Sequence, residues 1–124
     1  MKLTQQSQPE TTYRIRRYEP GRITVNETVY ERSLVVSPDE IFVDWPPESF
    51  SELAEEHMRF LATLSPELVL LGTGANQRFP NPALLRALIT QGIGVEVMDT
   101  AAACRTYNVL LAEERRVAAA LFMI

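Results

Sequence analysis

The sequence predicts an α/β fold in which helices cover a sheet that contains parallel strands. Residues 68–71 are all apolar, which is typical of a strand buried on both faces. Apolar residues then recur at helical spacing in residues 82–89 and alternate in residues 93–97. Because strand, helix and strand follow one another, the helix is expected to serve as a crossover between two parallel strands.

Local signals set the ends of these elements. Gly72 closes the first apolar run and opens a loop. Asn81 is a favourable N-cap and Pro82 a favourable first helical residue, while Gly92 is a typical residue for the end of a helix. The segment between the two strands therefore predicts a glycine loop followed by one short helix.

Composition indicates one soluble domain. The chain has 124 residues and a net charge of −4, which argues against nonspecific binding to nucleic acid or an anionic membrane. Its one cysteine excludes an internal disulfide and a multi-cysteine metal site, and fits a reducing compartment. Without a long apolar run or an apolar signal region, we expect a cytoplasmic protein with no membrane span, no cofactor and no metal.

The N-terminal third predicts β-structure after a polar tail. Residues 1–12 are nearly patternless and predict a disordered tail, so that residues 13–124 form the domain. Asn26 and Glu27 are expected to turn a hairpin, although Glu27 is unfavourable in a type I′ turn, which prefers glycine there. Strands are expected at residues 13–18, 22–25, 28–30, 33–36 and 41–43.

Two further helices and a last strand complete the prediction. Ser49 and Glu52 form a capping-box pattern before an apolar stripe, which predicts a helix that starts near residue 50 and ends before Pro66. Asp99 or Thr100 is expected to cap another helix. The apolar side of this helix is expected to hold Ala103, Cys104, Tyr107, Leu110 and Leu111. Residues 117–123 predict the final strand, and its alanines would let a helix pack closely.

The glycine loop, residues 72–77, is the first candidate for a site. Its backbone N–H groups could cradle an anion or a small ligand at the end of a parallel strand. Alternatively, the glycines only make a tight connection. A dinucleotide-binding fingerprint would need glycine in place of Gln77, and no Gly-Lys-Ser or Gly-Lys-Thr follows as in a phosphate-binding loop.

Glu96 is the second candidate, because a carboxylate in a strand covered on both faces would be partly buried and need a partner. Arg78, Arg86 and Arg105 are the candidate partners. A functional interpretation makes Glu96 a general base or a ligand anchor near Asp99. The structural interpretation, a charge pair between strand and helix, is favoured because no nucleophile is evident beside it.

Three other features have a structural interpretation that we favour. Cys104 follows a helix start, where a thiol can be activated, but its apolar neighbours predict a small buried hydrophobe. His57 lies within an apolar stripe and is expected to be packed rather than catalytic. The arginines among the tyrosines of the first strands could suggest nucleic acid, but an exposed strand face is favoured on an acidic chain.

The segments LLGTGANQRFP and GIGVEVMDTAAACRTYNVLLAEERRVAAAL resemble the MTH-type domain family, whose biochemical function is unknown. That family is similar to the mitochondrial complex I assembly factor three and the adipogenesis-associated MTH-domain protein. The resemblance extends over roughly residues 15–123 and implies a single three-layer domain, with a mixed central sheet flanked by helices and an N-terminal β-hairpin region. Glu27 and Glu114 stand where the family is expected to have glycine.

Two functional hypotheses remain open. The first is a non-catalytic binding or assembly factor, linked by the resemblance to respiratory complex I, which contacts a protein partner or a second copy through the loop or a strand edge. The second is a small-molecule-binding protein or an unrecognised enzyme with a pocket at the loop. The residues expected at either site are Gly72, Thr73, Gly74, Asn76, Arg78, Glu96, Asp99, Thr106 and Asn108.

Overall fold

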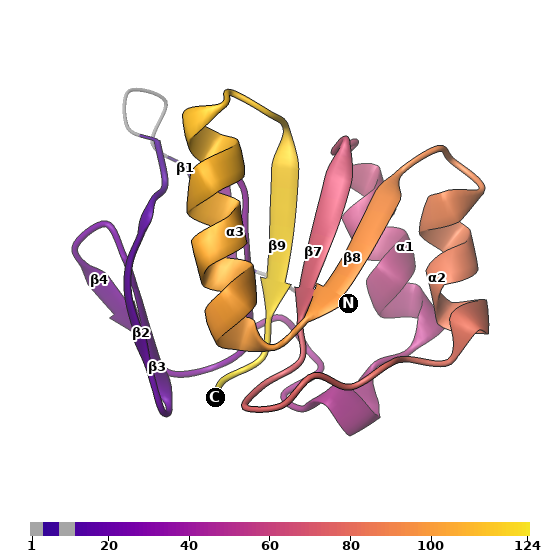
Figure 1. Cartoon of the computed structure of the whole chain (residues 1–124), viewed down its shortest axis with the longest axis horizontal. Helices are drawn as coiled ribbons and strands as arrows, with labels where there is room; N and C mark the ends of the chain where they lie inside the picture. The colour runs from indigo at the N-terminus through magenta and orange to yellow at the C-terminus, as the bar shows by residue number, and fades with distance from the viewer. Residues whose placement is uncertain (1–3, 8–11) are drawn as a thin grey trace.

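The computed structural model describes residues 4–7 and 12–124 and has two sheets and three α-helices over that range (Figure 1). The strands are β1 Thr4–Ser7, β2 Ile15–Glu19, β3 Arg22–Val25, β4 Thr28–Tyr30, β5 Leu34–Val36, β6 Glu40–Val43, β7 Leu68–Gly72, β8 Gly94–Met98 and β9 Val117–Leu121. The helices are α1 Glu55–Thr63, α2 Pro82–Ile89 and α3 Thr100–Ala112, with a 3-10 turn at Phe50–Glu52.

The central sheet is mixed, as the family resemblance implied. Its strand order is β1-β6-β5-β9-β7-β8. Strands β7, β8 and β9 are parallel, whereas β5 pairs antiparallel with β9 and β6. The crossover from β7 through α2 to β8 is therefore the unit that the sequence predicts, and β9 returns between β7 and β5.

Helices and a second sheet cover the two faces of the central sheet, which gives the three expected layers. Alternate residues of β7 point to opposite faces: Leu70 packs with α3, β2 and β3, whereas Val69 and Leu71 pack with α1 and α2. All three side chains are fully buried. This burial on both faces is the reason that β7 reads as a continuous apolar run.

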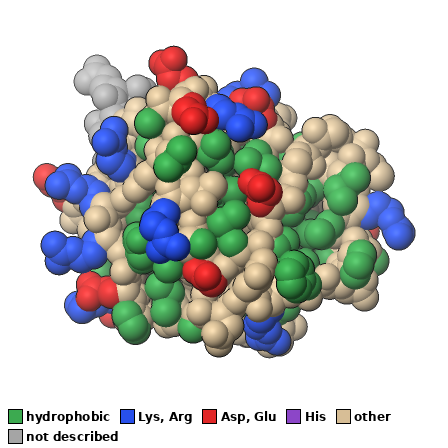
Figure 2. All heavy atoms as spheres, viewed as in Figure 1, with side chains coloured by type: hydrophobic (Ala, Val, Ile, Leu, Met, Phe, Trp, Pro, Cys, Tyr) green, Lys and Arg blue, Asp and Glu red, His purple; other side chains and the backbone are tan. Residues whose placement is uncertain are grey.

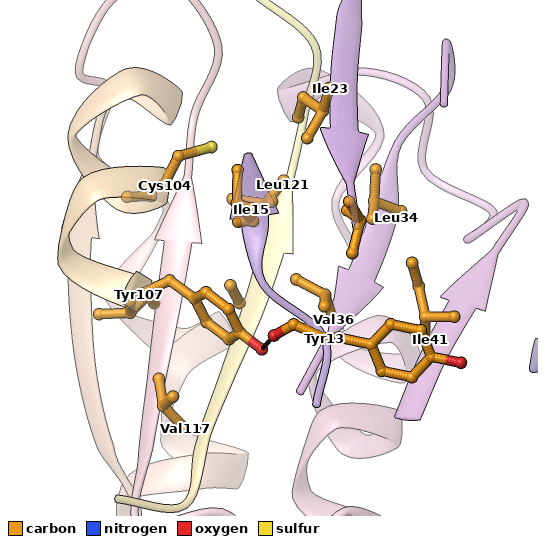
Figure 3. Close-up of a cluster of buried hydrophobic side chains, with 14 of the residues drawn as sticks. Tyr13, Ile15, Ile23, Leu34, Val36, Ile41, Cys104, Tyr107, Val117 and Leu121 are labelled. Atoms are coloured by element: carbon orange, nitrogen blue, oxygen red, sulfur yellow. Dashed lines mark hydrogen bonds between the residues drawn. The ribbon is translucent and has the colours of Figure 1, made fainter. Parts of the chain in front are cut away.

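The antiparallel sheet β2-β3-β4 lies beside α3 on one face of the central sheet (Figure 1). The Oη of Tyr107 in α3 donates to the backbone carbonyl of Tyr13 at 2.8 Å (Figure 3). Ile15, Ile23 and Val36 belong to the same buried cluster as the two tyrosines (Figure 3). The N-terminal hairpin region is thus part of the hydrophobic core.

Two predicted boundaries are wrong. Residues 4–7, expected in a disordered tail, form β1 at one edge of the central sheet, paired antiparallel with β6; residues 1–3 and 8–11 lie outside the described residues. The helix expected from residue 50 starts only at Glu55, because Leu53 and Ala54 are extended and separate it from the short 3-10 turn. That break places the Leu53 side chain in the core.

The predicted hairpin is present, with Asn26 and Glu27 between β3 and β4. Asn26 has a φ of +53°, whereas Glu27 does not have a positive φ, so the turn is not type I′. Asn26 is held by the strand beside it: its backbone N–H donates to the Arg14 carbonyl, and its side-chain oxygen accepts from the Arg14 N–H, both at 2.9 Å.

Candidate functional site

The glycine loop is a junction where three chain segments meet at the carboxyl ends of the parallel strands. The Thr100 side chain, fully buried at the start of α3, links them. Its Oγ1 accepts from the backbone N–H of Gly74 at 2.8 Å and donates to the carbonyl of Phe122 at 2.7 Å. The loop after β7, the start of α3 and the end of β9 are therefore joined through one hydroxyl group.

Two glycines allow this close approach. A Cβ on Gly72 would lie 3.0 Å from the Leu121 side chain, 3.0 Å from Thr100 Oγ1 and 3.1 Å from Thr100 Cα. Gly74 has a φ of +103°, which side-chain-bearing residues rarely adopt. Both glycines are therefore explained by packing and backbone geometry alone.

Three backbone N–H groups at the junction are already used as donors. Thr73 N–H donates to the carbonyl of Met98 at 2.9 Å, Gly74 N–H to Thr100, and Arg78 N–H to Thr73 Oγ1 at 3.1 Å. The Thr73 hydroxyl in turn donates to the carbonyl of Asn76 at 2.6 Å. These N–H groups are consequently not available to cradle an anion, which favours the structural interpretation of the glycines.

The polar side chains predicted beside the loop point to different neighbours. Asp99 caps α3 by accepting from the Ala102 N–H at 2.8 Å. Thr106 lies over Met98, with 3.5 Å between Oγ1 and Sδ. Asn108 faces β2 instead, where it donates to the Ile15 carbonyl at 2.7 Å and accepts from the Ile15 N–H at 3.1 Å.

Arg78 extends toward the other face of the sheet, so the predicted side chains do not converge. Its guanidinium carbon lies 4.6 Å from the centre of the Phe50 ring, and Phe50 packs against the core under α1 and α2. Phe79, the next residue, is 75% exposed. The structure thus gathers Gly72, Thr73, Gly74 and Thr100 into one junction and places Arg78 and Asn108 outside it.

The expectation that Glu96 is partly buried is wrong. Glu96 is exposed, and no salt bridge involves it in the described part of the chain. The physical reason is the strand order: β8 lies at the edge of the sheet, while α3 makes most of its contacts with β7 and β9. Periodicity within one strand does not show whether that strand is central or at an edge.

Two hollows on the surface lie at the opposite end of the parallel strands. One of about 520 Å³ is bordered by Pro66, Gly92 and Arg116, and another of about 310 Å³ lies between Pro38 and Arg116. Neither is lined by any residue of the predicted site.

The single cysteine is a core residue, as its apolar neighbours predicted. Cys104 is fully buried on the inner side of α3 (Figure 3). Burial raises the pKa of its thiol to about 12, and the nearby Arg105 lowers it only in part. Because the thiolate is the reactive species, Cys104 is inert at neutral pH.

His57 has a structural role at the start of α1 that the sequence pattern did not indicate. Its Nδ1 accepts from the Ala54 backbone N–H at 2.9 Å, so it satisfies one of the free donors at the helix N-terminus. Its ring packs edge-on against Trp45, with 5.9 Å between ring centres. Burial lowers the pKa of His57, and the neighbouring Glu56 and Glu52 raise it by less.

We predict that this histidine makes the fold less stable as the pH falls. The lowered pKa means that the unfolded chain binds a proton more readily than the folded chain. The contribution of His57 is therefore complete above its ordinary pKa of about 6.5 and is lost as the pH falls toward the folded pKa. Urea unfolding at pH 7.5 and 5.5 measures the loss.

The variant His57→Gln is the matched control, because an amide oxygen can accept the Ala54 N–H but does not titrate. Other ionisable groups affect both proteins equally. The wild-type chain should therefore lose more unfolding free energy than His57→Gln between the two pH values. Equal losses in the two proteins would show that His57 does not contribute.

The mixed sheet, its covering helices and the glycine junction define a small α/β domain of one class. The family described as "Protein of unknown function (DUF498/DUF598)" matches residues 15–122, and the chain belongs to this family. The match covers β2 to Phe122, and hence every residue of the predicted site.

Two named relatives illustrate what this chain is similar to. The zebrafish (Danio rerio) protein named NADH dehydrogenase [ubiquinone] 1 alpha subcomplex assembly factor 3 is 36% identical over 107 residues, which are 84% of this chain and 60% of the relative. The chain thus spans less than two-thirds of that relative. A Francisella tularensis protein named 13 kDa major membrane protein is 28% identical, and the match covers 81% of this chain and 82% of that protein.

Solved structures confirm the fold. A Bordetella parapertussis protein superposes with a TM-score of 0.87 at 36% identity, covering 92% of this chain and 98% of that one. A Xanthomonas campestris protein gives a TM-score of 0.84 at 43% identity, covering 95% and 89%. A Bordetella pertussis Mth938-like domain gives 0.81 at 30% identity, covering 98% and 92%. In the part of this chain that the structure describes, no helix is long and apolar enough to cross a membrane.

Proposed function

We propose that this chain is a non-catalytic, cytoplasmic binding factor that takes part in the assembly of respiratory complex I. The main support is the group of relatives named as complex I assembly factor 3, of which the zebrafish protein is one. The junction geometry agrees with this proposal, since Thr73, Gly74 and Asn108 are engaged in holding the fold together. A binding factor needs no catalytic group, and its contact surface can lie on exposed side chains.

The surface we assign to the partner lies around the outer side of the loop. Phe79 lies two residues beyond the glycine loop and is the most exposed of the large hydrophobic side chains described. Exposed aromatic side chains are common anchors of protein interfaces. Figure 2 shows further hydrophobic side chains on the face that carries α3, with charged side chains scattered among them. No observation favours a small-molecule pocket at residues 72–76.

Deletion of the gene in its native host tests the assembly role. We expect less assembled complex I on native gels and lower NADH:quinone activity, both restored by the wild-type chain. The variant Phe79→Asp should restore them poorly. The matched variant Val29→Asp, at a 52% exposed position on β4 in the other sheet, should restore them fully.

The two parts of the proposal fail separately. Normal complex I in the deletion strain would reject the assembly role. Full restoration by Phe79→Asp would leave the assembly role intact and show that the partner binds elsewhere. A captured partner whose binding depends on Phe79 but which belongs to another complex would support the assigned surface and reject the role in complex I assembly.

A further inference from the structure

Strand β8 is a free edge with a defined set of unused hydrogen-bonding groups. In the parallel ladder with β7, Gly94 N–H donates to the Glu67 carbonyl at 3.1 Å, and the Met98 carbonyl accepts from Thr73 N–H at 2.9 Å. Residues 94, 96 and 98 therefore point their backbone groups at β7. Because the pattern alternates, Val95 and Val97 point theirs away from the sheet.

A side-chain contact confirms this direction. Gln77 Nε2 donates to the Val97 carbonyl at 2.9 Å from outside the sheet. Within the described residues, β8 pairs with no strand other than β7. The Val95 N–H, the Val95 carbonyl and the Val97 N–H are consequently available to form hydrogen bonds with another strand. A row of such groups is the template that an extended peptide uses when it adds to a sheet.

Glu96 decides which strand this edge accepts. Its side chain is exposed midway along β8, between the two residues whose backbone groups point outward. If two copies paired antiparallel with Val95 opposite Val97, Glu96 would lie directly opposite the Glu96 of the other copy. Two like charges in directly opposed positions destabilise a strand pair. The edge therefore opposes self-pairing in the register that uses most of its free groups.

We propose that β8 is a docking edge for an extended segment of a partner protein that carries Lys or Arg opposite Glu96, between two β-branched residues. The basic side chain pairs with a carboxylate that has no salt bridge in the described part of the chain. The flanking residues lie on the face of Val95 and Val97, which pack toward α2. This inference rests on the proposed function only in taking the partner to be a protein.

A variant of the chain itself supplies a partner strand of this chemistry. Glu96→Lys presents Val95, a lysine and Val97, so the wild-type and variant chains offer each other complementary edges. Mixed together, they should form a 1:1 complex that associates roughly tenfold more tightly than either chain with itself. Native mass spectrometry with one chain isotopically labelled measures all three pairings, and higher salt should weaken the mixed complex.

Val95→Pro in the wild-type chain is the control that removes the outward N–H and leaves the ladder with β7 intact. It should abolish the mixed complex while circular dichroism and thermal unfolding show a folded chain. As a second probe, a fluorescent peptide with the central sequence Thr-Val-Lys-Val-Thr should bind the wild-type chain and not Val95→Pro.

Three results would overturn the proposal. These are the absence of binding with both probes, a mixed complex that survives Val95→Pro, and a wild-type dimer as tight as the mixed complex. The readouts use purified chains and are independent of complex I. If the chains and the peptide do not bind at β8, the proposed assembly role is unaffected. If complex I is normal in the deletion strain, the proposed binding edge is unaffected.

Discussion

Replacing Thr100 by valine is expected to lower the unfolding free energy by about 2–4 kcal/mol. Valine has nearly the same shape, so the packing at this fully buried position changes little. The hydroxyl is lost, however, and it accepts from Gly74 N–H and donates to the Phe122 carbonyl. Each buried backbone group left without its partner costs about 1–3 kcal/mol. Chemical denaturation monitored by tryptophan fluorescence measures the change.

Thr100→Ser separates the hydroxyl from the methyl group. Serine keeps both hydrogen bonds and loses one methyl, so we expect a loss of only about 1 kcal/mol. A valine variant as stable as the wild-type chain would show that the hydroxyl does not hold the junction. Equal destabilisation by serine and valine would assign the effect to packing.

The central crossover could be predicted because its signals are local. The apolar run of β7, the Asn81 cap and the end of α2 before Gly92 each depend on neighbouring residues, and the structure confirms all three. Asn81 accepts from the Ala83 N–H at 2.9 Å, as an N-cap should. The last strand was placed correctly too, but its direction depends on the strand order of the sheet, which local pattern does not encode.

The junction could be predicted only in part because its contacts are distant in sequence. The sequence pattern predicts Thr100 only as a possible helix cap, whereas its side chain bonds residues 26 positions before it and 22 after it. The prediction that Glu96 is partly buried is wrong for a related reason: the same alternation fits a covered strand and an edge strand. Asn108 was grouped with the loop by its position in α3, yet α3 turns that side chain toward β2.

Asn108→Leu is expected to lower the unfolding free energy by about 1–3 kcal/mol, because it leaves two backbone groups of Ile15 without partners. Leucine has a similar size, so the change isolates the amide. The effect should also be local, since Asn108 ties α3 to β2. Hydrogen exchange should show lost protection in β2 and β3 before the central strands β7 and β9 are affected.

Arg105→Ala is the matched control on the same helix. Arg105 also reaches β2, where its guanidinium donates to Tyr18 Oη at 3.2 Å, but this contact is exposed. Water can replace an exposed hydrogen bond, so Arg105→Ala should leave the protection of β2 unchanged. Uniform loss of protection in Asn108→Leu would mean that the three-stranded sheet and the central sheet unfold as one unit. Selective loss would identify the Asn108 contact as the attachment that keeps the N-terminal sheet on α3.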